Sequence, residues 1–265
     1  MLREVLERLT KGEISIDEAE KLLRVTAITE VGEIARLDVN REMRKGIPEI
    51  ILAEGKRAED LADITLEMLK KRGRAIISRV SREQIEAIRK VVPEDSQPQT
   101  NESARMIILK REGFKVEKTG GRIGILTAGT SDIPFAEEAK TVAEEMGCEV
   151  ATAYDVGVAG IHRLFQPLSE MVKKDVDVLV VVAGREGALP SVVAGMVDVP
   201  VIGVPTSISY GFGEKGLSAL MAMLQACSLG LAVVNIDGGV SAGAVAALIA
   251  NRVTKFRKNE GEDGS

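Results

Sequence analysis

The sequence predicts an α/β protein in which a small α+β region precedes a three-layer, doubly wound parallel sheet of flavodoxin-like type. Short apolar runs and helical segments alternate strictly from residue 119 onward, which is typical of successive βα units. Runs such as Val178–Val182 are continuously apolar, as expected of strands buried on both faces. Each run ends in glycine and small polar residues, where such sheets bind their ligands.

Residues 1–118 are predicted to form an N-terminal helical and small α+β domain. Its helices are expected over 2–9, 15–24 and 58–71 and onward from Ser81. Its strands are expected over 33–38, 48–53, 74–80 and 104–109. The loops carry the cations Arg41, Arg44, Lys45, Lys56 and Arg57. Each can be a solvated surface charge; the functional alternative is that Arg41, Arg44 and Lys56 contact an anionic ligand shared with the second domain.

Residues 119–256 are predicted to form the second domain, and residues 257–265 a disordered tail. Its strands are expected near 123–127, 148–153, 177–182, 200–204 and 231–235. Its helices are expected near 133–146, 160–174, 187–197, 214–229 and 241–256.

Composition excludes several classes of protein. The 265 residues are 45% hydrophobic and 28% charged, as in globular proteins, and the net charge of -5 argues against nucleic acid as the main ligand. No window can span a bilayer and no signal peptide is visible, so the cytoplasm is expected. Two cysteines and one histidine cannot supply a disulfide framework or a structural zinc site.

The stretch Arg122–Asp132 predicts an anion site. A buried strand leads into Gly129, Thr130 and Ser131, and Asp132 with Pro134 opens a helix. Backbone amides in a glycine loop at a helix N-terminus can approach an anion closely. The sequence has neither a G-x-G-x-x-G fingerprint in the first crossing nor a P-loop lysine motif.

Polar residues follow the other strands as well, and the carboxyl ends of parallel strands share one edge of the sheet. The candidates there are Asp155, His162, Arg163, Gly184, Glu186, Ser207 and Asp237. Each of these residues can also have a simple structural role. His162 can be a hydrogen-bonded surface or core histidine, Glu186 a solvated carboxylate, Asp132 a helix cap and Asp237 a turn former. Cys227 shares a helical face with Leu217, Leu220, Met221 and Leu224, so periodicity alone favours a buried core residue; Cys148 has the same interpretation.

Several motifs resemble known families. Residues 129–132, the Gly160–Arg163 turn and the Ala188–Met196 run resemble the PurE carboxylases and mutases of purine synthesis. Here His162-Arg163 is followed by Leu-Phe, where PurE has Thr-Pro. The whole chain is more similar to the LarB family, through stretches in both domains: Arg41–Glu49, Gly55-Lys56, Gly184–Val193, Met223–Cys227 and Val234–Gly239.

The LarB resemblance implies carboxylation of the pyridinium ring of nicotinic acid adenine dinucleotide by CO2 and hydrolysis of its phosphoanhydride. The products are a pyridinium-3,5-biscarboxylate mononucleotide and AMP, for nickel-pincer cofactor synthesis. An electron-poor ring cannot attack CO2, but a thiolate adduct can, which implicates Cys227 as nucleophile and Glu186 as its base. Asp132, His162 and Asp237 could serve proton or ribose steps.

The resemblance also implies Mg²⁺, bound through Asp132 or Asp237, no organic cofactor, and a homo-oligomer, an octamer as in PurE. Two alternatives stay open. One is a PurE-type aminoimidazole ribonucleotide carboxylase or mutase, in which His162 and the 129–132 loop act and Cys227 is dispensable. The other is a non-catalytic nucleotide-binding module, which the polar strand ends also permit.

Overall fold

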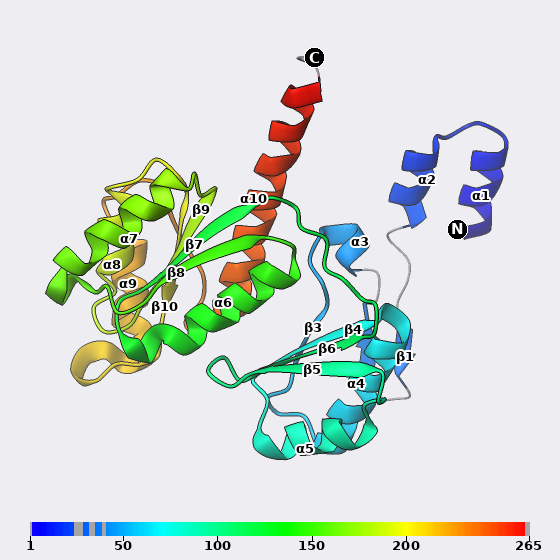
Figure 1. Cartoon of the computed structure of the whole chain (residues 1–265), viewed down its shortest axis with the longest axis horizontal. Coiled ribbons are helices and arrows are strands. Elements are labelled where there is room, and N and C mark those ends of the chain that lie inside the picture. Colours follow the sequence, from blue (N-terminus) through cyan, green and yellow to red (C-terminus); the bar gives the residue numbers. More distant parts are fainter. Residues whose placement is uncertain (1, 24–28, 32–34, 39–40, 263–265) are drawn as a thin grey trace. The chain divides into compact units, whose positions relative to one another are not determined.

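The computed structural model describes residues 2–23, 29–31, 35–38 and 41–262. The chain divides into two compact units (Figure 1). The first comprises Met1–Thr100 and Ile107–Phe114, and the second comprises Asn101–Met106 and Lys115–Ser265. No helix among the described residues is long and apolar enough to cross a membrane.

The first unit has a four-stranded sheet in the order β3-β4-β6-β5 and a separate β1-β2 ribbon. Strand β3 runs parallel to β4, and β6 runs antiparallel to β4. Its helices are α1 (Leu2–Thr10), α2 (Ile16–Leu23), α3 (Arg41–Lys45), α4 (Ala58–Arg72) and α5 (Arg82–Val91). Its strands are β1 (Thr29–Val31), β2 (Ala35–Leu37), β3 (Ile50–Leu52), β4 (Arg74–Ser78), β5 (Ser96–Asn101) and β6 (Met106–Arg111).

Local signals place the helices of this unit. The predicted capping box of α2 is present, since Glu18 N–H donates to Ser15 Oγ at 3.2 Å and Ser15 N–H donates to Glu18 Oε2 at 2.9 Å. Gly73 ends α4 in the left-handed conformation at φ 69°. Three elements were not predicted: β1, α3 and β5. Residues 33 and 34 of the strand predicted over 33–38 lie outside the described residues.

The second unit is a three-layer α/β sandwich, as predicted. Its parallel sheet has the order β11-β10-β9-β7-β8, and short 3-10 turns follow β7, β8 and β10. The strands are β7 (Arg122–Thr127), β8 (Glu149–Ala153), β9 (Val178–Ala183), β10 (Val201–Pro205) and β11 (Leu231–Val233). The helices are α6 (Ile133–Glu145), α7 (His162–Lys173), α8 (Leu189–Ala194), α9 (Leu217–Leu224) and α10 (Gly239–Glu262).

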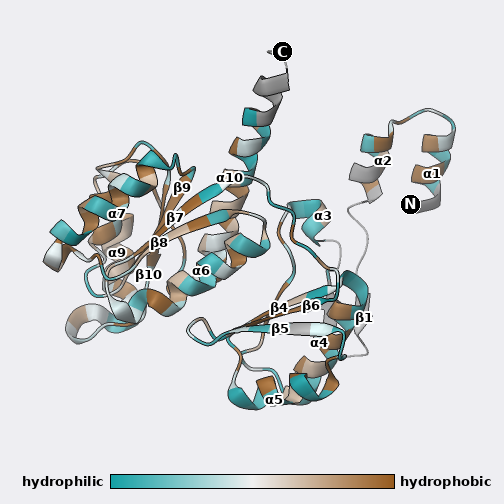
Figure 2. Ribbon diagram, viewed as in Figure 1, coloured by the Kyte–Doolittle hydropathy of each residue, from teal (hydrophilic) through white to brown (hydrophobic). Residues whose placement is uncertain are grey.

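Helices cover both faces of this sheet (Figure 1): α6 and α10 pack together on one face, and α7, α8 and α9 lie on the other. All six residues of β9 are buried, in agreement with its continuous apolar run. Figure 2 shows the same contrast between apolar strands and helices with one polar face. The core on the α7 side joins Leu164, Leu179 and Met223 from a helix, a strand and a second helix.

Two predictions for the second unit need correction. Helix α10 continues to Glu262, so the tail predicted from residue 257 is helical over 257–262; no proline stops it, and its last turns are rich in polar helix formers. Helix α9 ends at Leu224 and turns Ala219 and Met223 toward the sheet. Met221 and Leu224, predicted to face the core with Cys227, are exposed.

Candidate active site

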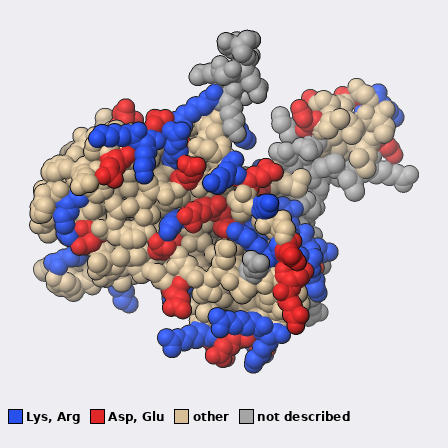
Figure 3. Space-filling view, in the orientation of Figure 1, with Lys and Arg blue, Asp and Glu red and all other residues tan. Residues whose placement is uncertain are grey.

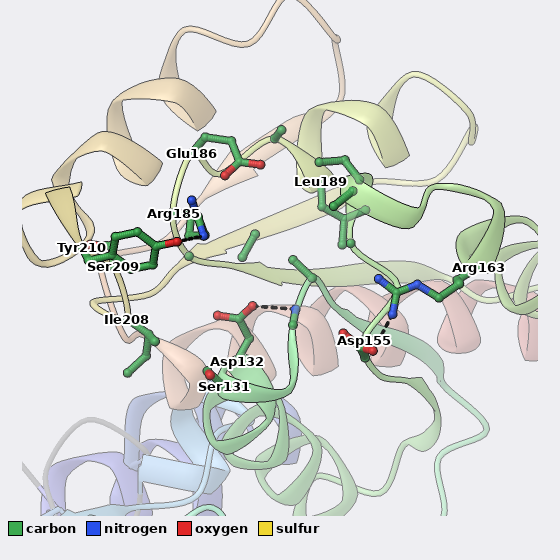
Figure 4. Close-up of a pocket in the computed structure, with 18 residues that line it drawn as sticks. Ser131, Asp132, Asp155, Arg163, Arg185, Glu186, Leu189, Ile208, Ser209 and Tyr210 are labelled. Carbon is green, nitrogen blue, oxygen red and sulfur yellow. Dashed lines mark hydrogen bonds and ion pairs between the residues drawn. The ribbon is translucent and has the colours of Figure 1, made fainter. Parts of the chain in front are cut away.

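A cavity of about 470 Å³ lies at the carboxyl ends of β7, β8, β9 and β10. The strand order explains its position. Strand β8 pairs with one edge of β7 and β9 with the other, so the loops after β7 diverge from those after β9 and leave a crevice. Its charged lining residues are Asp132, Asp155, Arg163, Arg185 and Glu186 (Figure 4).

Asp132 is a buried carboxyl group in the cavity wall, only 5% exposed. Its Oδ2 accepts a hydrogen bond from the backbone N–H of Gly129 at 2.9 Å, and its Oδ1 accepts one from the Thr206 hydroxyl at 2.8 Å. Burial raises the pKa of Asp132, although these hydrogen bonds oppose the rise. The predicted side-chain cap of α6 is absent, because Asp132 reaches back to Gly129 instead. A raised pKa lets this carboxyl group keep its proton to a higher pH than an ordinary aspartate, a property often found in residues that transfer protons.

The loop after β8 supplies an ion pair. Arg163 Nη1 donates to Asp155 Oδ2 at 2.5 Å, and Asp155 N–H donates to the Thr127 hydroxyl at 3.0 Å. Gly157 allows this loop to approach the one after β7, since a Cβ there would lie 2.4 Å from the carbonyl oxygen of Ala128. The pair neutralises itself, so Arg163 offers less net charge to a ligand than the sequence suggested.

Glu186 lies in the loop after β9, with an exposed side chain that lines the cavity. The described residues give its carboxylate no hydrogen-bond or ion-pair partner, which leaves it available to a substrate or a thiol. Gly129, Ser131 and Gly184 also line the cavity, and their contact with a ligand stays a prediction.

Other predicted site residues lie beside the cavity and do not line it. Thr130 and His162 are exposed at the starts of the 3-10 turn before α6 and of α7. Asp237, at φ 57°, has a structural contact: its Oδ1 accepts a hydrogen bond from Ser207 N–H at 2.7 Å. Asp237 therefore holds the base of the segment that follows β10, whose next residues, Ile208, Ser209 and Tyr210, do line the cavity.

The two cysteines differ sharply in environment. Cys148 is buried, its Sγ donates to Asn251 Oδ1 at 3.3 Å, and burial raises its pKa to about 11. Cys227 is exposed, which overturns the core role that periodicity favoured. Helix α9 carries the chain from the carboxyl end of β10 toward the amino end of β11, and Cys227 lies in the turn between them. It does not line the cavity, so one chain does not bring Cys227 and Glu186 together.

The predicted N-terminal cations belong to the first unit. Arg41 pairs with Glu49 at 3.1 Å, and Arg44 pairs with Asp38. Lys56 is exposed. Acidic and basic side chains are interspersed over the face drawn in Figure 3. The two arginines have the carboxylate partners expected of a solvated polar edge, and their contact with substrate stays a prediction.

A metal site made by the protein alone is not visible. Within the described ranges, no group of three or more His, Cys, Asp or Glu residues is placed to hold an ion. Asp132 already accepts two hydrogen bonds, and Asp155 is paired with Arg163. The cavity suits Mg²⁺ only as a companion of substrate phosphates, with one carboxylate as protein ligand.

Arg185 and Tyr210 line the cavity and interact with each other, and neither was among the predicted site residues. Arg185 Nη1 donates to the Tyr210 hydroxyl, and Arg185 Cζ lies 4.4 Å from the centroid of the Tyr210 ring. Both lie in strand-end loops that the sequence had marked as ligand-binding. Their position in those loops could have identified them, but the prediction selected mainly glycines and carboxylates there.

The fold defines a PurE-like α/β protein with a cavity at the topological switch point of its sheet. The AIR carboxylase family model matches residues 122–261, and the model of the LarB/PurE-like N-terminal domain matches residues 28–111. The chain therefore belongs to the AIR carboxylase family, with the two-domain architecture of LarB.

Relatives support this assignment at two levels. An uncharacterised protein of Methanocaldococcus jannaschii is 48% identical over 258 residues, covering 96% of this chain and 98% of its own length. An N5-carboxyaminoimidazole ribonucleotide mutase of the same organism is 35% identical over 126 residues, 47% of this chain and 75% of the relative. The mutase of Thermotoga maritima is 30% identical over 133 residues, 48% and 74% respectively. The carboxylase and mutase likeness thus concerns the second unit.

Proposed function

We propose that this carboxylase-family protein carboxylates the pyridinium ring of nicotinic acid adenine dinucleotide and hydrolyses its phosphoanhydride, releasing AMP. One observation carries the proposal: a LarB-type N-terminal domain and an AIR carboxylase domain occur together in one chain. The mutase relatives match only about half of this chain, so their reaction does not account for the N-terminal domain.

The covalent step assigns defined roles to two groups. A Cys227 thiolate adds to a ring carbon, and the ring accepts the electron pair as a dihydropyridine. The resulting enamine carbon forms the new bond to CO2. Loss of the ring proton and departure of the thiolate then restore the aromatic ring. Glu186, unpartnered in the cavity wall, is the base for the thiol proton, and Asp132, with its raised pKa, is suited to carry the ring proton.

Because Cys227 does not line the cavity of its own chain, we propose that it serves the cavity of another copy. The surface around Cys227 supports this arrangement. Met221, Leu224 and Leu229 are exposed, and Leu229 is 92% exposed. Apolar side chains of this size gathered near one turn are typical of a surface covered by a partner. A homo-oligomer would bury them and bring the thiol to a neighbouring cavity.

Hydrolysis of the phosphoanhydride places a further demand on the cavity. Water must attack one phosphorus atom while the bond to the bridging oxygen breaks. Mg²⁺ would neutralise the phosphate oxygens when bound, with Glu186 or Asp132 as its carboxylate ligand. The protein's own contribution is to hold the nucleotide at the Gly129–Asp132 loop, where Gly129 and Ser131 line the cavity.

Complementation between two inactive variants tests the shared site. Cys227→Ala and Glu186→Gln are each expected to abolish formation of the pyridinium-3,5-biscarboxylate mononucleotide from nicotinic acid adenine dinucleotide with bicarbonate and Mg²⁺. Co-expression of the two should restore roughly a quarter of wild-type activity, because half the cavities keep Glu186 and half of their neighbours supply Cys227. Cys148→Ala is the matched control and should remain active.

Four outcomes would contradict parts of the proposal. An inactive mixture of the two inactive variants would show that Cys227 acts within its own chain. Full activity of Cys227→Ala would end the covalent mechanism. Turnover of aminoimidazole ribonucleotide without any AMP release would favour the purine carboxylase or mutase, and ligand binding with no turnover of either substrate would favour a nucleotide-binding module.

A further inference from the structure

Arg185 differs from every other charged residue of the cavity in having no assigned role and no counter-ion. The other cavity arginine, Arg163, is paired with Asp155. Among the described residues, no carboxylate pairs with Arg185. The cavity otherwise contains three carboxylates, those of Asp132, Asp155 and Glu186. Arg185 is therefore the cation of this cavity that remains available to a ligand.

The backbone around Arg185 is fixed. Arg185 has φ 51°, in the left-handed region that arginine rarely adopts. Its carbonyl oxygen accepts a hydrogen bond from the Ser218 hydroxyl at 2.8 Å, and Gly187 N–H donates to Gly184 O at 2.9 Å. A Cβ on Gly187 would lie 2.7 Å from Ala219 O, so this loop is packed directly against α9. Such a conformation persists where surrounding contacts hold it, and it clusters at ligand sites.

The Arg185 side chain is also oriented. Its guanidinium lies over the Tyr210 ring, 4.4 Å from the centroid, and donates to the Tyr210 hydroxyl. Figure 4 shows this pair on one side of the cavity and Arg163 with Asp155 on the other. A guanidinium has five N–H donors, so one bond to Tyr210 leaves a fork for a ligand oxyanion. Stacking reduces the side-chain freedom that binding would otherwise remove.

We propose that Arg185, held by Tyr210, binds an oxyanion of the substrate, either a phosphate or the ring carboxylate. The identity of the substrate rests on the proposed function, but the anion site itself does not. Glu186 is the adjacent residue and repels an incoming anion. A cation beside it is therefore what allows an anionic nucleotide to lie within reach of that carboxylate.

Calorimetric binding of three probes to the full-length protein separates the two oxyanions. Nicotinic acid mononucleotide carries both groups, nicotinamide mononucleotide only the phosphate, and nicotinic acid riboside only the carboxylate. Arg185→Met should weaken binding of nicotinic acid mononucleotide about tenfold or more, the loss expected for a charged hydrogen-bonded pair. An equal loss for nicotinamide mononucleotide identifies the phosphate, and an equal loss for the riboside identifies the carboxylate. Arg185→Lys keeps the charge without the fork and should bind with intermediate affinity.

Tyr210 is a positioning residue in this scheme, and a double-mutant cycle tests that role. Tyr210→Leu should weaken the same probe as Arg185→Met, and the double variant should bind no more weakly than Arg185→Met alone. An independent structural effect of Tyr210 would instead add to that of Arg185. Circular dichroism and urea unfolding of the variants confirm that each is folded.

The inference fails if Arg185→Met binds all three probes as tightly as the wild-type protein, or if the wild-type protein binds none of them. Its failure is distinct from that of the proposed function. If the wild-type protein turns over the dinucleotide and Arg185→Met binds and reacts equally well, the anion site is refuted and the proposed function stands. If the probes bind in an Arg185-dependent way but the dinucleotide is not turned over, the proposed function is refuted and the anion site stands.

Discussion

Asp132 offers a sharp test of how the cavity wall is built, because two substitutions there should change the stability of the protein by very different amounts. Asp132→Ala removes both acceptors and leaves the Gly129 N–H and the fully buried Thr206 hydroxyl without this partner. Asp132→Asn keeps an oxygen for Gly129, and its amide can donate to Thr206 once that hydroxyl rotates to accept. The alanine variant should therefore be destabilised and the asparagine variant nearly unchanged.

The magnitude follows from the two hydrogen bonds. An unsatisfied buried polar group costs about 1–3 kcal/mol, so Asp132→Ala should lower the free energy of unfolding by about 2–4 kcal/mol, with water in the adjacent cavity limiting the loss. The pH dependence has a definite sign. The folded-state pKa of Asp132 is raised above its unfolded value of 3.8, so the folded protein retains a proton that the unfolded chain has lost. As pH rises through the folded-state pKa, the wild type should lose stability relative to Asp132→Asn, by about 1.4 kcal/mol for each unit of the rise in pKa.

Urea unfolding of the wild type and both variants, at a series of pH values from 4 to 8, measures these differences. Two results would refute the reasoning. One is an Asp132→Asn variant as unstable as Asp132→Ala at every pH, since the introduced amide would then be making neither bond. The other is a difference between wild type and Asp132→Asn that does not change with pH, which would mean that burial does not raise this pKa. Thr206→Val, which removes only the hydroxyl donor, should raise the pKa of Asp132 further and enlarge the total loss of stability as pH rises.

Two further predictions follow from the same structure. Iodoacetamide should alkylate Cys148 only after unfolding, because Cys148 is buried with a pKa of about 11. Labelling of Cys148 in the native protein, read by peptide mass spectrometry, would contradict this environment. Gly157→Ala should destabilise the protein by about 1–3 kcal/mol and reduce activity, since its Cβ would lie 2.4 Å from Ala128 O. Gly129→Ala is the control and should keep wild-type stability, because nothing lies nearer than 3.7 Å to its Cβ. Equal unfolding midpoints for the two variants would show that the loops after β7 and β8 can move apart freely.

Much of the fold could be predicted from local patterns. The second unit alternates buried strands with amphipathic helices, and the five predicted strands all overlap observed ones. Strand β5, which was not predicted, illustrates where prediction from local patterns fails. Its sequence, Ser96–Asn101, is polar and contains Pro98, and it lies at the edge of the sheet next to β6. An edge strand needs little apolar surface and can hold proline, so its strand character comes from pairing with β6 and leaves no periodic signal.

The candidate site divides in the same way. The rule that ligands bind at the carboxyl ends of parallel strands located the cavity, and it brought Asp132, Asp155 and Glu186 to one place. It could not identify Arg185, because the left-handed backbone and the stacking on Tyr210 join residues 25 positions apart. Nor could it show that Asp132 bonds to Thr206 instead of capping α6. Contacts of this kind depend on how loops from different strands meet in space.

Cys227 shows what separates a motif from a site. The helical spacing of Cys227 favoured a core position, and the resemblance to LarB favoured catalysis. The structure contradicts the core position, because the thiol is exposed in the turn before β11. Exposure makes the thiolate reactive but also leaves the adduct open to water, whereas carboxylation of a dihydropyridine needs a site that excludes it. A thiol at one end of the sheet and carboxylates at the other can meet around one ring only if a second chain closes the site. The exposed Met221, Leu224 and Leu229 around that thiol are the residues such closure would bury.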